Sequence, residues 1–187
     1  MKKERREKNA KALAIRSAKE SAYIALFVAL LISSQLLLSF FVGVELVTVL
    51  LISFSYAFGI RMGGAAATAF SLLRGFVFGF FPNVLILYLI YFNAITLLFG
   101  FLGKIKFCKK AWRFIPFVAT ACLCTAAFTM LDNLITPLWY AYTKRAWEAY
   151  FWASFAALIP QIICTAVTVS TLFYPLQKAF SLARKTV

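Results

Sequence analysis

The chain has 187 residues, of which 63% are apolar, 18% aromatic and only 14% charged, and its formal net charge is +14. Soluble domains carry about 25% charged residues, so this composition excludes an ordinary soluble domain. Nucleic-acid binding is also disfavoured, because the basic residues lie in clusters between apolar runs, as membrane topology requires. We therefore predict an all-α integral membrane protein.

The chain begins with a basic segment, residues 1–20, which mixes acids with Lys and Arg. It is too long and too charged for the start of a cleaved signal peptide, and no small-residue cleavage site follows the first apolar run. We expect it to remain on the cytoplasmic side as a helix near the anionic leaflet surface. The rest of the chain, residues 21–187, is expected to be one transmembrane domain.

Apolar runs of the length needed to cross ~30 Å of hydrocarbon recur along this domain. Gly43, Arg61, Pro82-Asn83 and Thr136-Pro137 mark turns between them, and Pro160 predicts a kink in the last run. We therefore predict a bundle of six transmembrane helices, at residues 21–41, 44–59, 62–81, 84–102, 114–135 and 150–172.

The basic residues fix the expected orientation of this bundle. In this reading, 17 of the 20 Lys and Arg residues fall on one side, and only Lys144 and Arg145 fall in the opposite loops. Because cytoplasmic loops carry an excess of Lys and Arg, both termini are predicted to be cytoplasmic. The remaining basic residue, Arg74, falls within the third predicted span.

The sequence disfavours most catalytic chemistry. It contains no histidine, which a serine hydrolase would use as its base and a metalloprotease as a zinc ligand. The four cysteines form no CxxC pair, and no phosphate-binding glycine loop occurs. We expect neither an enzyme nor a bound metal or cofactor.

Arg74 is the most informative single residue. An arginine within a span costs several kcal/mol unless it is paired or faces water. It is expected about seven residues from the outer end of its span, where Glu45 and Asp132 can approach it. Two readings stay open, an anion-binding group in an outward-facing cavity and a structural ion pair that ties spans together.

The outer halves of the later spans hold many polar and aromatic side chains. One reading is the aromatic belt found at membrane interfaces. The other is a small-molecule pocket, because pockets combine aromatic walls with a few polar anchors. The candidate substrate-binding residues are Glu45, Arg74, Asn83, Tyr88, Tyr91, Asp132, Asn133, Trp139, Tyr142 and Trp147.

Small residues in the first predicted span form a candidate docking face. Ala22, Ala25 and Ala29 share one side of a helix, and Ala25-Leu-Phe-Val-Ala29 is a small-xxx-small element. Such elements allow the backbones of two membrane helices to approach closely.

Together these features resemble the substrate-binding S components of energy-coupling factor (ECF) transporters, which import vitamins into bacteria and archaea. The resemblance rests on six predicted spans in under 200 residues, the basic lead-in, the Ala25-xxx-Ala29 element, and two segments, GVELVTVLLISFSYAFGIRMGG and FSLLRGFVFGFFPNVLILYLIYFNAITLLFG.

The resemblance implies a carrier without its own motor, in the plasma membrane of a prokaryote. Such a component binds a vitamin-like compound near the outer face and topples to release it when docked on a transmembrane T subunit and two ATPases. The family's alanine motif, which contacts the T subunit, maps onto Ala25 and Ala29. Its ligand loops map onto Gly43, Pro82-Asn83 and residues 137–148.

The identity of the vitamin stays open, and so do two functions of other classes. One is a structural subunit of a larger membrane complex, which would need no outer cavity at Arg74. The other is a small lipid-handling enzyme, which would need an acid cluster or an activated nucleophile at the cytoplasmic face.

Overall fold

The computed structural model describes residues 2–41, 45–109 and 111–184, and the side chains of all of these except residues 2–16, 109 and 111. This part of the chain is all-helical, as predicted. Its elements are α1 (Lys2–Leu38), α2 (Val47–Phe58), α3 (Ile60–Phe78), α4 (Pro82–Lys104), the short 3₁₀ helices η1 (Phe107–Lys109) and η2 (Ala111–Arg113), α5 (Phe114–Trp139) and α6 (Lys144–Arg184).

Four of these helices are long and apolar enough to cross a membrane. They are Ser17–Leu38 within α1, then α4, α5 and α6. The sequence and these helices together indicate a membrane-embedded protein. α2 has only 12 residues, about 18 Å of helix, which is shorter than the ~30 Å hydrocarbon layer.

The short helix α2 lies at the centre of the bundle. Ten of its 12 residues are buried, and it packs against α1, α3, α4 and α6. Phe54 of α2 stacks on Phe27 of α1 with ring centroids 3.9 Å apart. Because its neighbours surround it, α2 can be apolar on every side without being long enough to reach both surfaces of a bilayer.

Glycines set the tight junction where α2 turns into α3. Gly59 has a φ of +88°, a conformation that side chains disfavour, and its N–H bonds to the carbonyl of Ser55. A Cβ on Gly103 of α4 would overlap the carbonyl of Tyr56, and one on Gly100 would lie 2.9 Å from the backbone nitrogen of Ile60. The C-terminal part of α4 therefore packs directly on the backbone of this junction.

The helix ends differ from the predicted spans in three places. The basic lead-in and the first span form one continuous helix, α1. α5 runs through Pro137 to Trp139, although Thr136-Pro137 was expected to end it. α6 begins at Lys144 and runs through Pro160 and Pro175. The predicted outer loop is thus reduced to residues 140–143, and residues 42–44, around Gly43, lie outside the described residues.

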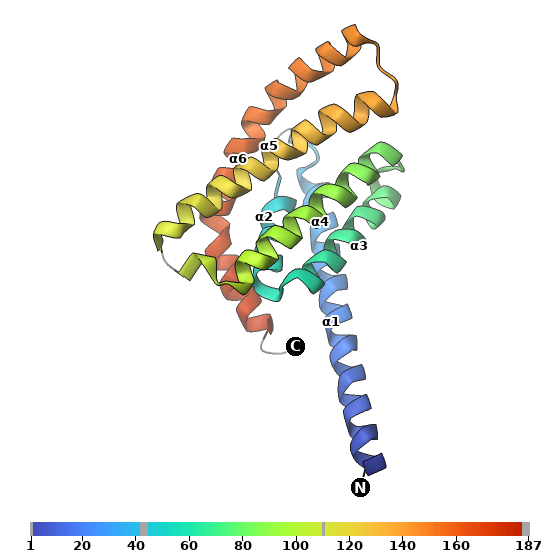
Figure 1. The fold of residues 1–187 in the computed structure, drawn as a ribbon, viewed down its shortest axis with the longest axis vertical. Coiled ribbons are helices and arrows are strands. Elements are labelled where there is room, and N and C mark those ends of the chain that lie inside the picture. The colour runs from blue at the N-terminus through green and yellow to red at the C-terminus, as the bar shows by residue number, and fades with distance from the viewer. Residues whose placement is uncertain (1, 42–44, 110, 185–187) are drawn as a thin grey trace.

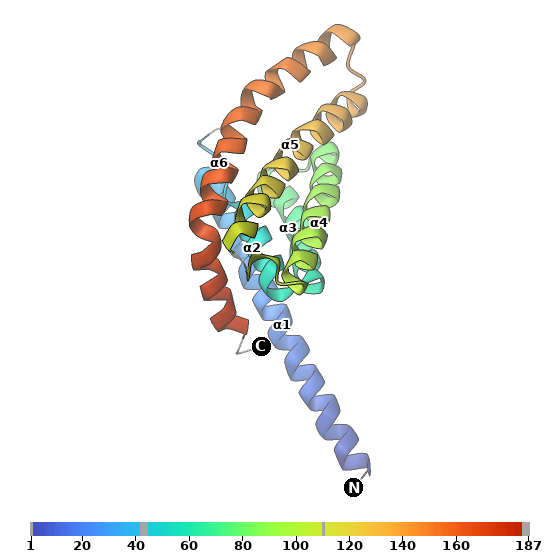
Figure 2. The same ribbon diagram turned by 60° about the vertical axis from the view of Figure 1, so that its left-hand side comes forward.

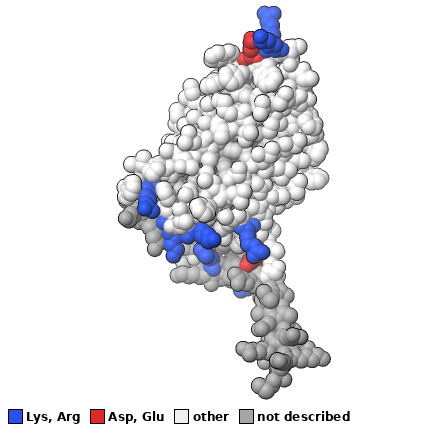
Figure 3. Space-filling model, viewed as in Figure 1, with Lys and Arg blue, Asp and Glu red and all other residues white. Residues whose placement is uncertain are grey.

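Figures 1 and 2 show that the two ends of the bundle are different. The N and C termini lie toward one end, which we call the termini end. The turn from α5 to α6 forms the tip of the other, which we call the hairpin end. In Figure 3, Lys and Arg gather near the termini end and again at the tip of the hairpin end, and the face between them is uncharged.

Candidate functional site

A cavity of about 240 Å³ lies where α1 and α3 end and α2 begins. Six of its lining residues carry polar or charged groups, the Tyr88 hydroxyl included, and the rest are apolar. The lining residues are Ser34, Gln35, Leu38, Ser39, Phe41, Glu45, Leu46, Val47, Arg74, Phe78 and Tyr88. Arg74, Glu45 and Tyr88 are three of the residues predicted from the sequence, and the fold brings them to one place.

Arg74 lies one turn before the end of α3, and its guanidinium sits between two aromatic rings. The guanidinium carbon is 4.4 Å from the centre of the Tyr88 ring and 5.2 Å from that of Phe78. Such cation–π contacts contribute about 2 kcal/mol when water is excluded. The aromatic walls hold the charge at the cavity without neutralising it.

Two buried polar atoms at this cavity have no hydrogen-bond partner among the described residues. They are Nε of Arg74, a donor, and Oε1 of Gln35, an acceptor. The Gln35 amide nitrogen donates a long hydrogen bond to the Tyr88 hydroxyl at 3.4 Å, and the amide oxygen has no partner among the described residues. Buried polar groups nearly always have a partner, so a water molecule or a polar ligand at this place would complete both hydrogen bonds.

Glu45 lines the same cavity, but its carboxylate is held elsewhere. Thr48 donates a hydrogen bond to Glu45 Oε1 at 2.6 Å, and the backbone N–H of Glu45 donates to Cys164 Sγ at 3.3 Å. Within the described part of the chain, no ion pair joins Glu45 to Arg74. The two side chains line one cavity without forming a salt bridge.

Asp132 lies in a separate network rather than beside Arg74. Its two oxygens accept hydrogen bonds from Thr136 at 2.7 Å and from Tyr150 at 2.5 Å. Asn83 of α4 donates to the Thr136 hydroxyl at 3.2 Å and accepts from Tyr140 at 3.4 Å. This network ties α4, α5 and α6 together at the hairpin end, and it explains the buried position of Asn83.

A polar stripe continues along the buried face of α5. Thr125, Thr129, Asn133 and Thr136 are all buried there, and the Thr125 hydroxyl lies 2.9 Å from that of Thr165 in α6. Both amide atoms of Asn133 are buried without a hydrogen-bond partner among the described residues. The interior between α4, α5 and α6 is therefore polar over several turns.

Tyr91 connects this stripe to the cavity region. It is buried in α4, and the surroundings of its hydroxyl include Thr48, Thr125 and Glu45. Tyr88 and Tyr91 are three residues apart on one face of α4, and the rings of both contact Phe128 of α5, while Tyr88 also lines the cavity.

The predicted aromatic cap does not cover the Arg74 cavity. Trp139 and Tyr142 are exposed, as expected for side chains at a membrane interface. Trp147 lines a shallow hollow on the surface of α6 together with Lys144, Glu148, Phe151 and Trp152.

The candidate docking residues lie on the open side of α1. Ala22, Ala25 and Ala29 are exposed, whereas Phe27, Val28 and Leu31 pack into the core. This face of α1 is therefore free of the described bundle.

Gln35 and Ser34 are site residues that the sequence reasoning missed. The signal was present, because Ser33-Ser34-Gln35 interrupts an otherwise apolar run at the helix end. Among the described residues there is no cluster of three or more His, Cys, Asp or Glu that could hold a metal ion.

Comparison of the chain with protein-family models, with curated proteins and with solved structures finds no match.

Proposed function

We propose that this protein is the substrate-binding component of an ECF-type importer, with a bundle of six helices in the membrane and both termini in the cytoplasm. Its substrate is a small vitamin-like compound with an anionic group. The observation that carries the proposal is the Arg74 cavity, where the Arg74 guanidinium forms no ion pair, its Nε lacks an acceptor, and the nearby Gln35 Oε1 lacks a donor.

The chemistry of the cavity supports a small substrate that is both charged and flat. Arg74 supplies the positive charge for a carboxylate or phosphate. Tyr88, Phe78 and Phe41 supply apolar walls. The volume of about 240 Å³ lies just below the usual range for ligand pockets, about 300–1,000 Å³, which favours a compact molecule.

The distribution of charge supports the orientation. The termini end carries most of the described Lys and Arg side chains in Figure 3, and it would face the cytoplasm. The Arg74 cavity would then open toward the outside. The open alanine face of α1 would meet the T subunit, and the ATPases would be partner subunits.

A ligand that accompanies the protein through purification tests the proposal. The chain is extracted in mild detergent, and small molecules released by denaturation are identified by mass spectrometry. We expect an anionic compound in near-stoichiometric amount, absent from an unrelated membrane protein purified from the same cells. A chain that retains only lipid from such a preparation, and takes up no candidate vitamin, is instead a structural subunit or a lipid-handling protein.

A further inference from the structure

A second pocket, of about 380 Å³, lies at the termini end, where α2 turns into α3 beside the C-terminal ends of α4 and α6. Three of its lining residues are cationic, and none is acidic. The lining residues are Tyr56, Ala57, Phe58, Gly59, Ile60, Arg61, Gly100, Gly103, Lys104 and Arg184. This charge is not used by the proposed function.

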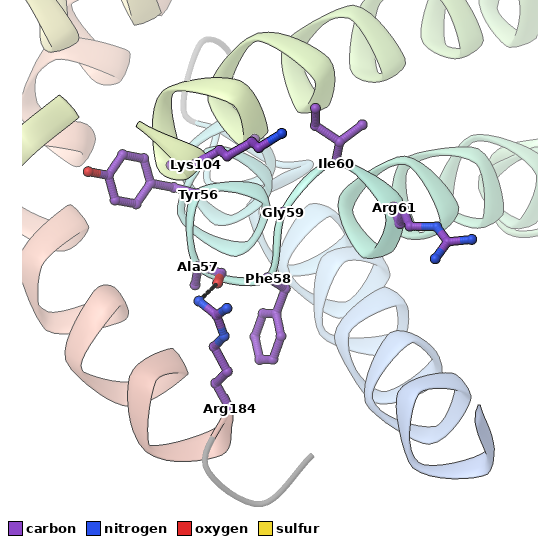
Figure 4. Close-up of a pocket in the computed structure, with 10 residues that line it drawn as sticks. Tyr56, Ala57, Phe58, Gly59, Ile60, Arg61, Lys104 and Arg184 are labelled. Atoms are coloured by element: carbon purple, nitrogen blue, oxygen red, sulfur yellow. Dashed lines mark hydrogen bonds between the residues drawn. The ribbon is translucent and has the colours of Figure 1, made fainter. Parts of the chain in front are cut away.

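Figure 4 shows how the three cations are placed. Arg184 reaches from α6 to the turn, where its Nη1 donates a hydrogen bond to the carbonyl of Ala57 at 3.0 Å. Lys104 extends from α4 on the other side of the turn, toward Ile60. Arg61 points away from the pocket centre, so it contributes charge at the rim.

Arg184 and Lys104 are both exposed at the pocket, and protein atoms occupy few of their donors. A guanidinium has five N–H donors, and the structure gives Arg184 one acceptor. Lys104 has no hydrogen bond or ion pair to any described residue. The N-terminus of α3, which carries a partial positive charge, begins between them without a side-chain cap.

The walls of the pocket are built from backbone that cannot shift easily. Gly100 and Gly103 allow α4 to pack directly on the backbone of residues 56 and 60. The hydrogen bond from Arg184 then fixes the end of α6 to the end of α2. Ile60, an exposed apolar side chain beside Lys104 in Figure 4, gives the pocket an apolar edge, while Phe58 beside Arg184 packs against Phe54 and Phe180.

We propose that this pocket binds the phosphate of an anionic phospholipid, with Arg184 and Lys104 as its direct ligands. A phosphate group can accept hydrogen bonds from the N–H donors of the Arg184 guanidinium and from the ammonium group of Lys104. Free phosphate shares this chemistry. The apolar edge, and the position of the pocket where the apolar belt ends, favour a headgroup whose acyl chains continue along the helices.

Native mass spectrometry of the full chain in detergent tests the proposal. The protein is titrated with phosphatidylglycerol, with phosphatidylcholine and with inorganic phosphate. We expect the first phosphatidylglycerol to bind at least tenfold more tightly than phosphatidylcholine. Equal binding of the two lipids overturns the proposal, and so does saturation by inorganic phosphate without a preference for phosphatidylglycerol.

Matched variants place the bound lipid. Arg184→Gln and Lys104→Gln should each weaken phosphatidylglycerol binding about tenfold or more, as expected for loss of a charged hydrogen bond. Lys106→Gln and Lys178→Gln remove charges that are equally exposed but do not line the pocket, and they should weaken phosphatidylglycerol binding less than about fivefold. Equal losses of phosphatidylglycerol affinity in the two pairs of variants would indicate that a general basic surface binds the lipid, and would refute the pocket.

Lys104→Arg keeps the charge and should restore binding. Melting curves then distinguish the loss of a lipid-binding side chain from the loss of the fold, because a variant that fails to bind only because it unfolds would have a lower melting temperature. A folded Lys104→Arg that binds no better than Lys104→Gln would count against Lys104 as a ligand.

Discussion

Replacing Arg74 by methionine separates a ligand-binding arginine from a structural one. Methionine follows the unbranched stem of arginine but lacks the guanidinium, so the change removes the charge and leaves a shorter side chain. In the ligand-free protein, it removes cation–π contacts worth about 2 kcal/mol. It also removes the burial of an unpartnered Nε, which costs about 1–3 kcal/mol. These two effects nearly cancel, so the melting temperature should change little.

Ligand binding should respond very differently. Loss of one partner from a buried charge pair costs about 2–5 kcal/mol, which is roughly 30-fold to several thousand-fold in affinity. The assay measures the amount of ligand retained per protein by mass spectrometry and, once the ligand is identified, its affinity by titration calorimetry. Melting curves are recorded on the same samples.

The matched control is Arg61→Met, at the opposite end of the same helix. Arg61 is exposed and lies outside the Arg74 cavity. This control should retain ligand as the wild type does. Unchanged retention in a folded Arg74→Met variant would remove Arg74 from the site. A large drop in melting temperature with a parallel loss of ligand would mean that Arg74 is structural.

Four further predictions address topology, docking and packing. A single cysteine introduced at Lys106 should be labelled only from the cytoplasm, and one at Lys144 only from outside. Labelling of the Lys106 site from outside intact cells would mean that the predicted orientation is wrong. Ala25→Trp should abolish uptake by the assembled importer and leave ligand binding intact, because the bulky ring blocks close helix contact; Leu26→Trp, at a neighbouring exposed position, is its control. Tyr150→Phe removes the hydrogen bond to Asp132 and should lower the unfolding free energy by about 1.5–3 kcal/mol, because this bond ends on a charged group; an unchanged melting curve would show that the bond contributes nothing. Gly103→Ala should destabilise the fold more than Gly64→Ala, because a Cβ at residue 103 meets the carbonyl of Tyr56 and one at residue 64 has its nearest contact at 3.7 Å.

The fold class could be predicted from the sequence because helix length and apolarity are local properties. The centres of all six predicted spans fall within α-helices. The ends were harder to place, because a proline acts differently according to its surroundings. Pro137 lies in the last turn of α5 and is buried. A proline that packing holds in place near an exposed turn can be followed by a few more helical residues. The sequence already indicated a short α2, because its predicted span, residues 44–59, is shorter than a membrane crossing, but its central position depends on four neighbouring helices.

The candidate site was harder to predict because it depends on which helix faces meet. Arg74 stood out as a charge in an apolar run, and Glu45 as an acid at the edge of one. The sequence placed Asp132 near Arg74 only by depth in the membrane. Because α5 packs against α6, Asp132 instead accepts a hydrogen bond from Tyr150. Depth alone cannot distinguish sides of a bundle, so residues at one level were grouped although they belong to two polar networks.

Helix α1 connects the two proposed activities physically. Its inner face supplies Ser34 and Gln35 to the Arg74 cavity, and its open face carries Ala25 and Ala29. Ala29 and Gln35 are six residues apart, about 9 Å along one helix axis. A ligand that hydrogen-bonds to Gln35 and a T subunit that packs on Ala29 would therefore act on the same rigid element. If ligand binding shifts or rotates α1, it changes the docking affinity, and docking must then change the ligand affinity by the same factor. A carrier that has to hold its substrate when alone and release it when docked needs coupling of this kind, and α1 is the element that both sites share.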